Sequence, residues 1–238
     1  MEEDIVFIML FSPRNIFGLY FFLILRKERI YMSANNESKR KLKTKDLAAC
    51  AMLSAVAFVL QFLEFAIPII PSFIKLDVSD IPALLGTFAL GPVYGVVIEL
   101  VKNIIHLPFG TSMAVGELCN FLLGAVFTFT AGMVYKYKHT RTGAIVGCLV
   151  GAFAMSAVCI PLNYFFVYPA YVVIYNMPLD AIIEMYKTIL PTVASTPTDN
   201  TLLNCLIIFN LPFTFLKGLL EAVICYAIYK PLSRLYRR

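Results

Sequence analysis

The amino-acid sequence predicts an all-α membrane protein, a single bundle of six transmembrane helices with both termini in the cytoplasm. Of its 238 residues, 60% are hydrophobic and only 15% are charged, and the mean hydropathy is +0.79. A soluble domain of this length needs more charge to cover its surface. A helix crosses the hydrocarbon core with about 20 residues, so the apolar runs leave room for roughly six crossings.

The start of the chain differs from the rest. In residues 1–31, two apolar pieces flank a break at Pro13, and each piece is too short to span a membrane. We interpret this segment as a peripheral or non-native extension, with Met32 as the biological start; an interfacial amphipathic segment is the alternative. Residues 32–45 form a basic leader, and the membrane domain is expected to cover residues 46–238.

The expected helices follow in order from residue 46. The first carries a stripe of small residues, including Ala51 and Ala55, on which another helix can pack closely. The second and third are short and are separated by the turn Gly91-Pro92. They are either partial helices that line a cavity or a tilted pair inside the bundle. The predicted spans are 46–65, 81–90, 93–105, 114–135, 142–167 and 203–228, with long connections at 67–80 and 168–202.

The later part of the chain contains further signals. Gly143, Gly147 and Gly151 in the fifth span predict a close approach to a neighbouring helix. The connection at 168–202 carries several prolines and one short helical pattern at 179–189, and connections this long are often functional lids.

Basic residues set the predicted orientation. Three basic blocks, at 39–45, at 136–141 and at the C-terminus, are separated by even numbers of spans and so lie on one side. By the positive-inside rule this side is the cytoplasm. The long connections then lie outside, and the protein is expected in a bacterial cytoplasmic membrane.

Polar side chains gather in the segment 75–124. Such groups are costly inside a membrane unless they face a cavity, a partner or the interface, so their clustering predicts a small-molecule site. Glu99 and Lys102 are expected to pair with each other. Glu117 and Asn120 either line the pocket or cap and tie the end of their helix. The polar positions are Asp77, Asp80, Glu99, Lys102, Asn103, His106, Glu117 and Asn120.

The sequence carries no motif of catalytic or metal chemistry. Its six cysteines have neither metal-ligand nor Cys-x-x-Cys spacing, and we expect them to be small buried hydrophobic residues. It contains no phosphate-binding loop, no Ser/His/Asp set and no zinc motif. We therefore expect no catalytic residue, no metal, no cofactor and no nucleic-acid partner.

Several segments, in this order, resemble the riboflavin-specific S components (RibU type) of energy-coupling factor (ECF) transporters. They are KLDVSDIPALLGTFALGP at 75–92, ELVKNIIHLPFGTSMAVGELCNFLLG at 99–124, PLNYFF at 161–166 and LPFTFLKG at 211–218. The resemblance covers about residues 43–235. It implies a six-helix substrate-binding subunit, without catalytic activity, that takes up riboflavin with a transmembrane coupling subunit and two cytoplasmic ATPases. It also implies that the stripe of Ala51 and Ala55 docks on the coupling subunit.

The resemblance further implies a set of ligand contacts. Asn163 and Lys217 match family positions that hold the polar edge of the vitamin, whereas Thr214 stands where the family has Asn; Asn210, one turn earlier, could compensate. The first outer loop would cover the site. Tyr164, Phe165 and Phe213 are expected near the flat ring of the vitamin. The candidate ligand-binding residues are Ile74, Lys75, Leu76, Asp77, Glu117, Asn120, Asn163, Tyr164, Asn210, Phe213, Thr214 and Lys217.

Alternatives remain for single residues and for the whole chain. Lys217 could instead pair with Glu221 at i+4, and Asn163 could bond the backbone of a neighbouring helix. Thr214 also suits an S component for another vitamin, or for a flavin such as FMN. A small membrane enzyme that uses Glu117, His106 and Lys102 as acid and base groups is a less favoured interpretation.

Overall fold

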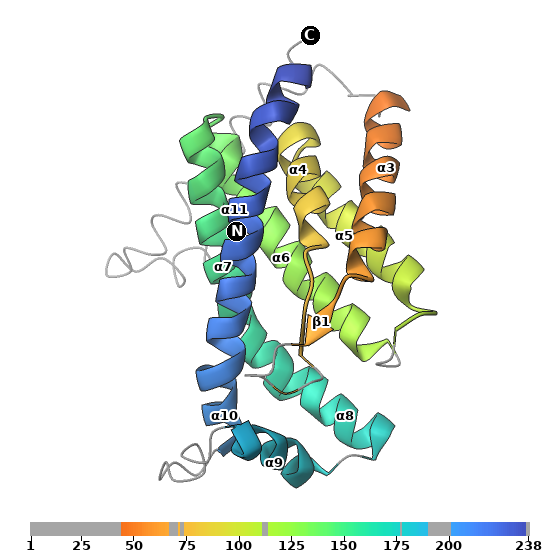
Figure 1. Ribbon diagram of the computed structural model, residues 1–238, viewed down its shortest axis with the longest axis vertical. Coiled ribbons are helices and arrows are strands. Elements are labelled where there is room, and N and C mark those ends of the chain that lie inside the picture. Colours follow the sequence, from red (N-terminus) through yellow and green to blue (C-terminus); the bar gives the residue numbers. More distant parts are fainter. Residues whose placement is uncertain are drawn as a thin grey trace, which may run out of the picture. The chain divides into compact units, whose positions relative to one another are not determined.

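The computed structural model describes residues 44–66, 71, 74–110, 114–176, 178–189 and 201–236 (Figure 1), with the side chains of the last helix described to residue 228. The predicted N-terminal extension at 1–31, Met32 and nearly all of the basic leader lie outside the described residues. Their assignment stays a prediction.

The described chain is almost entirely helical, and a short two-stranded ribbon interrupts it. Strands β1 (Phe65–Ala66) and β2 (Lys75–Leu76) pair antiparallel. Two segments have π-helical geometry, η1 (Asn163–Val167) and η3 (Leu206–Asn210). The α-helices are α3 (Thr44–Gln61), α4 (Asp80–Leu90), α5 (Pro92–His106), α6 (Val115–Tyr137), α7 (Arg141–Leu162), α8 (Tyr168–Tyr175), α9 (Leu179–Ile189), α10 (Thr201–Cys205) and α11 (Leu211–Tyr236).

Within the described residues, four helical runs are long and apolar enough to cross a membrane: Thr44–Gln61, Val115–Tyr137, Arg141–Ile174 and Thr201–Ile228. They correspond to the first, fourth, fifth and sixth predicted spans. Helices α4 and α5 have 11 and 15 residues, fewer than the about 20 that a crossing takes. The described structure is thus nearly all helical, with four helices that could span a membrane, and α4 and α5 are short as predicted.

Local sequence signals explain several helix ends. Gly91 joins α4 to α5 with φ of +123°, a conformation that glycine adopts at little cost, and Pro92 then opens α5. The Thr140 side chain caps α7 by accepting a hydrogen bond from the backbone amide of Gly143 at 3.1 Å. Pro161 lies inside α7, and because it has no amide hydrogen to donate, the regular hydrogen-bond pattern is broken just before η1 begins.

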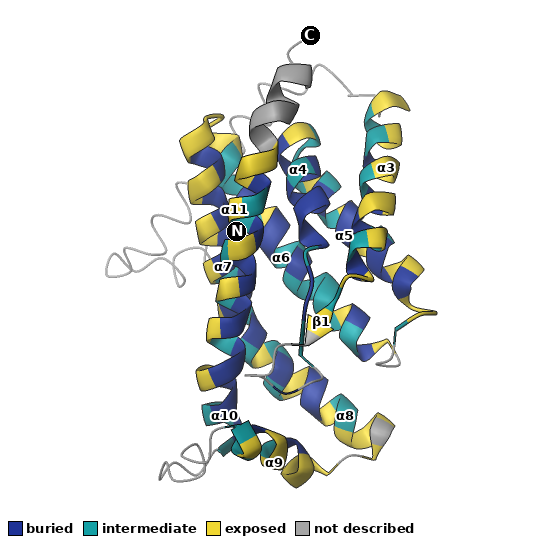
Figure 2. Cartoon of the chain, viewed as in Figure 1, coloured by how far each residue is buried: buried dark blue, intermediate teal, exposed yellow. Residues whose placement is uncertain are grey.

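Helices α6 and α7 pack closely because glycine lines their contact. A side chain at Gly147 would meet the backbone oxygen of Ala131 at 2.6 Å, and one at Gly151 would meet that of Phe127 at 2.7 Å. The predicted close approach of the fifth span is confirmed. Buried residues of α4, α6, α7 and α11 form a core between these helices, whereas the outward faces expose apolar side chains such as Phe153 and Val223 (Figure 2). An apolar outer surface is what lipid requires.

Helices α8, α9 and α10, from the region of the connection predicted at 168–202, lie together at one end of the bundle (Figure 1). Helix α9 spans Leu179–Ile189, as its sequence pattern predicted. Its Ile182 and Tyr186 are fully buried against Tyr168, Leu206 and neighbouring residues. The long connection therefore contributes a packed helix that covers this end.

Candidate ligand-binding site

A cavity of about 190 Å³ lies where α3, the β-ribbon, α5, α6, α7, η1, η3 and α11 converge. Its wall combines charged, amide and apolar side chains, a mixture typical of sites that bind and orient a small molecule. The lining residues are Gln61, Glu64, Ile74, Lys75, Asp77, His106, Gly116, Glu117, Cys119, Asn120, Leu123, Met155, Cys159, Asn163, Val167, Tyr171, Asn210, Phe213, Thr214 and Lys217.

The structure brings the predicted ligand-binding residues to this cavity, except Leu76 and Tyr164. Leu76 lies in strand β2, where side chains alternate, so the strand turns Leu76 away while Lys75 and Asp77 face the cavity. Tyr164 packs with the cluster beneath α9. Phe165 is 75% exposed and does not line the cavity, so the expectation that it lies near the flat ring of a ligand is wrong.

Some lining residues were missed by sequence reasoning. Gln61 ends α3 and Glu64 follows it, Cys159 lies near the end of α7, and Tyr171 lies in α8. A polar residue where an apolar helix ends is a usable signal for Gln61 and Glu64, since such a position faces either water or a site. Nothing in the local pattern distinguishes Cys159 from the other cysteines.

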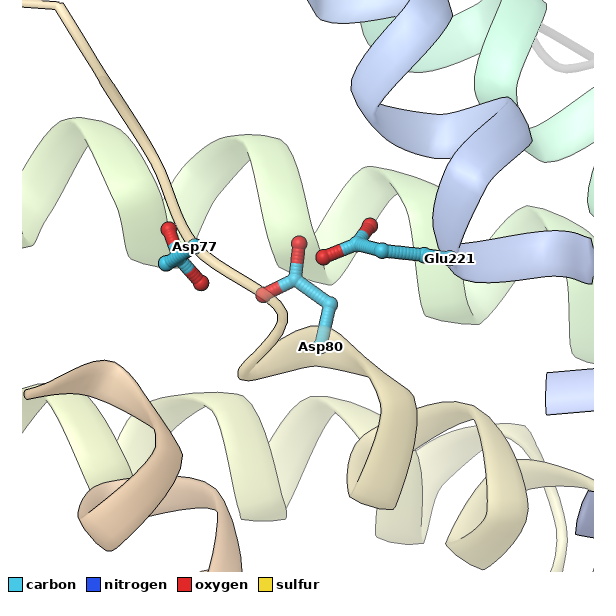
Figure 3. A group of neighbouring side chains, drawn as sticks. All are labelled: Asp77, Asp80 and Glu221. Atoms are coloured by element: carbon cyan, nitrogen blue, oxygen red, sulfur yellow. The ribbon is translucent and has the colours of Figure 1, made fainter. Parts of the chain in front are cut away.

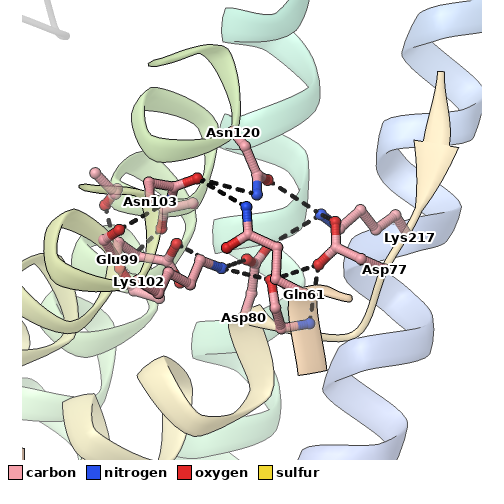
Figure 4. Close-up of polar contacts among 12 residues, drawn as sticks. Gln61, Asp77, Asp80, Glu99, Lys102, Asn103, Asn120 and Lys217 are labelled. Carbon is pink, nitrogen blue, oxygen red and sulfur yellow. Dashed lines mark hydrogen bonds and ion pairs between the residues drawn. The ribbon is translucent and has the colours of Figure 1, made fainter. Parts of the chain in front are cut away.

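Lys217 extends from α11 to the connection between β2 and α4. Its Nζ lies 2.9 Å from Asp77 Oδ2, 3.4 Å from Asp80 Oδ2 and 3.5 Å from Asn120 Oδ1 (Figure 4). The alternative pairing with Glu221 is wrong, because in the described part of the chain Lys217 forms its ion pairs with the two aspartates.

Asp77 sits in the connection at the edge of the bundle. Burial alone would raise its pKa, but Lys217 and Lys102, with a hydrogen bond from Ser79, hold the pKa of the carboxyl well below its ordinary value. Asp77 is therefore an ionised partner for Lys217. This contact ties the connection between β2 and α4 to the last helix.

A second ammonium lies behind the cavity wall. Lys102 forms ion pairs with Asp80 and with Glu99 Oε2, the latter at 2.8 Å, and it donates to Ser79 Oγ at 2.7 Å. The predicted pair of Glu99 and Lys102 is confirmed. Because Lys102 does not line the cavity, the acid and base set proposed for an enzyme, with His106 and Glu117, is not assembled.

Glu117 and Asn120 both face the cavity and both tie α6 to its neighbours. Glu117 Oε1 lies 3.3 Å from His106 Nδ1. Asn120 and Gln61 each donate to Asn103 Oδ1, at 3.4 and 3.2 Å (Figure 4). Glu117 and Asn120 therefore line the cavity and tie α6 to α5, but among the described residues no side chain caps the start of α6.

Another part of the cavity wall is neutral. Asn163 Nδ2 donates to the Cys159 carbonyl oxygen at 2.8 Å, within its own helix, and Thr214 Oγ1 donates to Cys159 Sγ at 3.2 Å. Asn210 Oδ1 accepts a hydrogen bond from the Tyr186 hydroxyl at 2.7 Å, and its Nδ2 donates to the Tyr168 hydroxyl at 3.3 Å. Asn210 thus links the cavity wall to helix α9.

Among the described residues, Asp77, Asp80 and Glu221 bring carboxylate oxygens within 4.8 Å of one another, the spacing that a metal ion requires (Figure 3). Both aspartates already form ion pairs with lysines. A metal ion would have to compete with these ammonium groups for the same oxygens.

Comparisons with known proteins agree with this architecture. The family model described as ECF transporter, substrate-specific component matches residues 45–229. The chain is 36% identical over 203 residues to the riboflavin transporter RibU of Staphylococcus aureus (strain TCH60), covering 84% of this chain and 98% of that protein. It is 30% identical over 191 residues to the riboflavin transporter FmnP of Bacillus subtilis (strain 168), covering 79% and 92%.

A solved structure also resembles the fold. It is that of the S component of a bacterial ECF transporter, with a TM-score of 0.64 and 33% sequence identity, covering 82% of this chain and 99% of that one. The residues that line the cavity, from Gln61 to Lys217, all lie within the range that the family model matches.

Proposed function

The chain belongs to the family of ECF transporter substrate-specific components, and we propose that it captures riboflavin for uptake across the bacterial cytoplasmic membrane. As a member of this family it is a multi-pass membrane transport subunit, not an enzyme. Riboflavin is the natural ligand class to propose, because the similar proteins of S. aureus and B. subtilis are riboflavin transporters.

One observation carries the proposal. Lys217 and Asn163, which match the family positions for the polar edge of the vitamin, come from different helices and line the same cavity, as does Thr214. A uracil-like ring edge presents both donors and acceptors, which an ammonium, an amide and a hydroxyl can satisfy. The apolar lining residues Leu123, Met155 and Phe213 suit the flat ring.

In this proposal the ligand enters from outside. The bundle has six membrane segments, with α4 and α5 as the short second and third, and both termini are cytoplasmic according to the basic blocks. The first outer connection, from Ile74 to Asp77, covers the ligand. Residues 1–31 are proposed to be dispensable, so a chain that begins at Met32 is expected to insert and bind as the full chain does.

The partners follow from the family. An ECF module has other subunits, and we assign a transmembrane coupling subunit and two cytoplasmic ATPases to this chain. Ala51 and Ala55 are both exposed on α3, next to exposed Met52 and Val56. A flat, apolar stripe of small residues allows another helix to approach closely, so this face suits the coupling subunit.

Flavin binding tests the proposal directly. We expect the purified protein to carry a flavin absorbance spectrum and, after the ligand has been removed, to quench riboflavin fluorescence in a saturable titration. FMN in the same titration measures what the phosphate costs, since it adds about −1.5 to −2 charge, and thiamine is the unrelated control. Absence of both copurified flavin and quenching, in protein that melts cooperatively, would reject riboflavin as the ligand.

A further inference from the structure

A buried cluster of charged residues contains more acids than bases. Four carboxyl groups and two ammonium groups lie between α4, α5, α11 and the residues that precede α4, and each of these residues is at most 9% exposed. If all were ionised, two negative charges would remain uncompensated. Burying an unpaired charge is expensive, so the uncompensated carboxyls require protons or other cations, and the contacts locate the site of one of them. The six residues are Asp77, Asp80, Glu99, Lys102, Lys217 and Glu221.

The missing cation can be located from the contacts. Asp77 pairs with Lys217, and Lys102 pairs with both Asp80 and Glu99. Glu221 is 0% exposed, and neither of its carboxyl oxygens has a hydrogen-bond partner among the described residues. Its side chain extends from α11 toward the Asp80 carboxylate (Figure 3), whose Oδ2 also lacks a hydrogen bond in the described structure.

The geometry distinguishes a proton from a metal ion. A metal at Asp77, Asp80 and Glu221 needs one oxygen from each aspartate, and each of those oxygens already has a partner. Asp77 Oδ2 and Asp80 Oδ2 lie 2.9 and 3.4 Å from Lys217 Nζ, Asp80 Oδ1 pairs with Lys102, and Asp77 Oδ1 accepts from Ser79. The metal ion and the Lys217 ammonium would then lie within a few ångströms of each other in the protein interior, where their repulsion is weakly screened. A proton needs one oxygen as its site and one as acceptor, and it removes the charge of Glu221 without displacing Lys217.

We propose that Glu221 holds a buried proton in the folded protein, with the Asp80 carboxylate as its hydrogen-bond acceptor. The ionisable groups that surround it are Asp77, Asp80, Lys102, Lys217 and the thiols of Cys148 and Cys225. Because Glu221 is neutral, it does not compete with Asp77 for Lys217. This proton site goes beyond the proposed function, since neither Glu221 nor Asp80 lines the cavity.

Infrared spectroscopy of the flavin-free protein at neutral pH tests the proposal. A protonated carboxyl has a carbonyl stretching band separate from that of a carboxylate, and the band shifts in D₂O. We expect the wild type to show this band. The component of the band that comes from Glu221 should be missing in Glu221→Gln, and the band should be unchanged in Glu64→Gln. Glu64 is the matched control because it is partly exposed and ion-paired with Lys75.

The outcomes decide between a proton and the alternatives. A wild type without the band, or a band that is unchanged in Glu221→Gln, overturns the proposal. So does a rise in melting temperature on adding Na⁺ or Mg²⁺ that the wild type shows and Glu221→Gln lacks. If Glu221→Gln does not fold, Glu221→Asp keeps a titratable group in a new position, and an unchanged band frequency in that variant also overturns it. Since no flavin is present, failure here is distinguishable from failure to bind riboflavin.

Discussion

The two sides of the cavity are held by different interactions. On the ionic side, Asp77 and Lys217 line the cavity and Asp80 and Lys102 lie behind its wall; the buried ion pairs of these four residues join α11 and α5 to the connection before α4 and to the start of α4. The neutral side, defined by Cys159, Asn163, Asn210 and Thr214, consists of hydrogen bonds that join η1 and α11 to α7, and η3 to α8 and α9. The ionic side is thus sensitive to the loss of one partner, whereas each bond of the neutral side contributes little.

A surface outside both sides provides the largest expected functional effect. The exposed stripe on α3 touches neither the ionic nor the neutral side, so Ala51→Trp with Ala55→Trp is expected to abolish uptake while riboflavin affinity stays unchanged. The reason is steric, since a bulky side chain prevents close helix approach. Uptake by whole cells and flavin titration of the purified variant measure the two properties. Unimpaired uptake would show that the coupling subunit docks elsewhere.

The ionic side should be the more fragile of the two. Asp77→Ala leaves the Lys217 ammonium without its nearest partner, and we expect a loss of stability of about 3–5 kcal/mol. Adding Lys217→Met removes the orphaned charge and should restore part of that stability but not riboflavin binding. Thermal melting and flavin titration check this, and a single variant as stable as the wild type would refute the role of the ion pair.

The same pair predicts a pH dependence. Because the folded-state pKa of Asp77 is lowered, its contribution is fully present above the ordinary carboxyl pKa of about 4 and is lost only as pH falls through the lowered value. The difference in the free energy of unfolding between the wild type and Asp77→Ala should therefore be constant from neutral pH to about pH 5. A difference between wild type and Asp77→Ala that already declines in this range would contradict an ionised Asp77.

Direct ligand contacts should have intermediate effects. Lys217→Ala and Asn163→Ala are each expected to weaken riboflavin binding by about 1–3 kcal/mol, the usual cost of leaving a buried polar group unpaired. Fluorescence quenching of the solubilised variants measures it. Unchanged affinity in both variants would move the polar edge of the ligand away from these helices.

On the neutral side, loss of the hydrogen bond between Tyr186 of α9 and Asn210 should have a smaller effect still. Tyr186→Phe removes the hydroxyl that donates to Asn210, which is expected to cost about 0.5–1.5 kcal/mol and to increase hydrogen exchange in α9. Tyr171→Phe is the comparison variant, because Tyr171 lines the cavity on the same side. Equal exchange in α9 for both variants would argue against a specific role for Tyr186.

The smallest expected change is at Thr214. Thr214→Asn restores the residue that the family resemblance implies, and riboflavin affinity should stay equal or improve, because an amide can donate and accept at the same time. The titration should include FMN. A clear loss of riboflavin affinity, with FMN affinity retained, would favour the phosphorylated flavin as ligand.

Sequence reasoning succeeded where the deciding interaction is local. The apolar runs located the membrane helices, the turn Gly91-Pro92 separated two short ones, and the pattern at 179–189 located α9. The pair Glu99 and Lys102 was found because three residues along a helix are neighbours in space. Glycine spacing likewise identified the close contact of α7 with α6.

Only the tertiary structure decided which residues that are far apart in the sequence contact each other. By local spacing Lys217 belongs with Glu221, yet its partner is Asp77, 140 residues earlier, because folding places the connection beside α11. The π-helical turn at Asn163–Val167 shifts the phase of the helix, so the 3.6-residue period could not place Phe165. Sequence alone thus determined the membrane helices and the residues at which polar groups interrupt them. Which of those polar groups pair, which line the cavity and which keep an unpartnered carboxyl depends on how the helices pack, because these contacts join residues far apart in the chain.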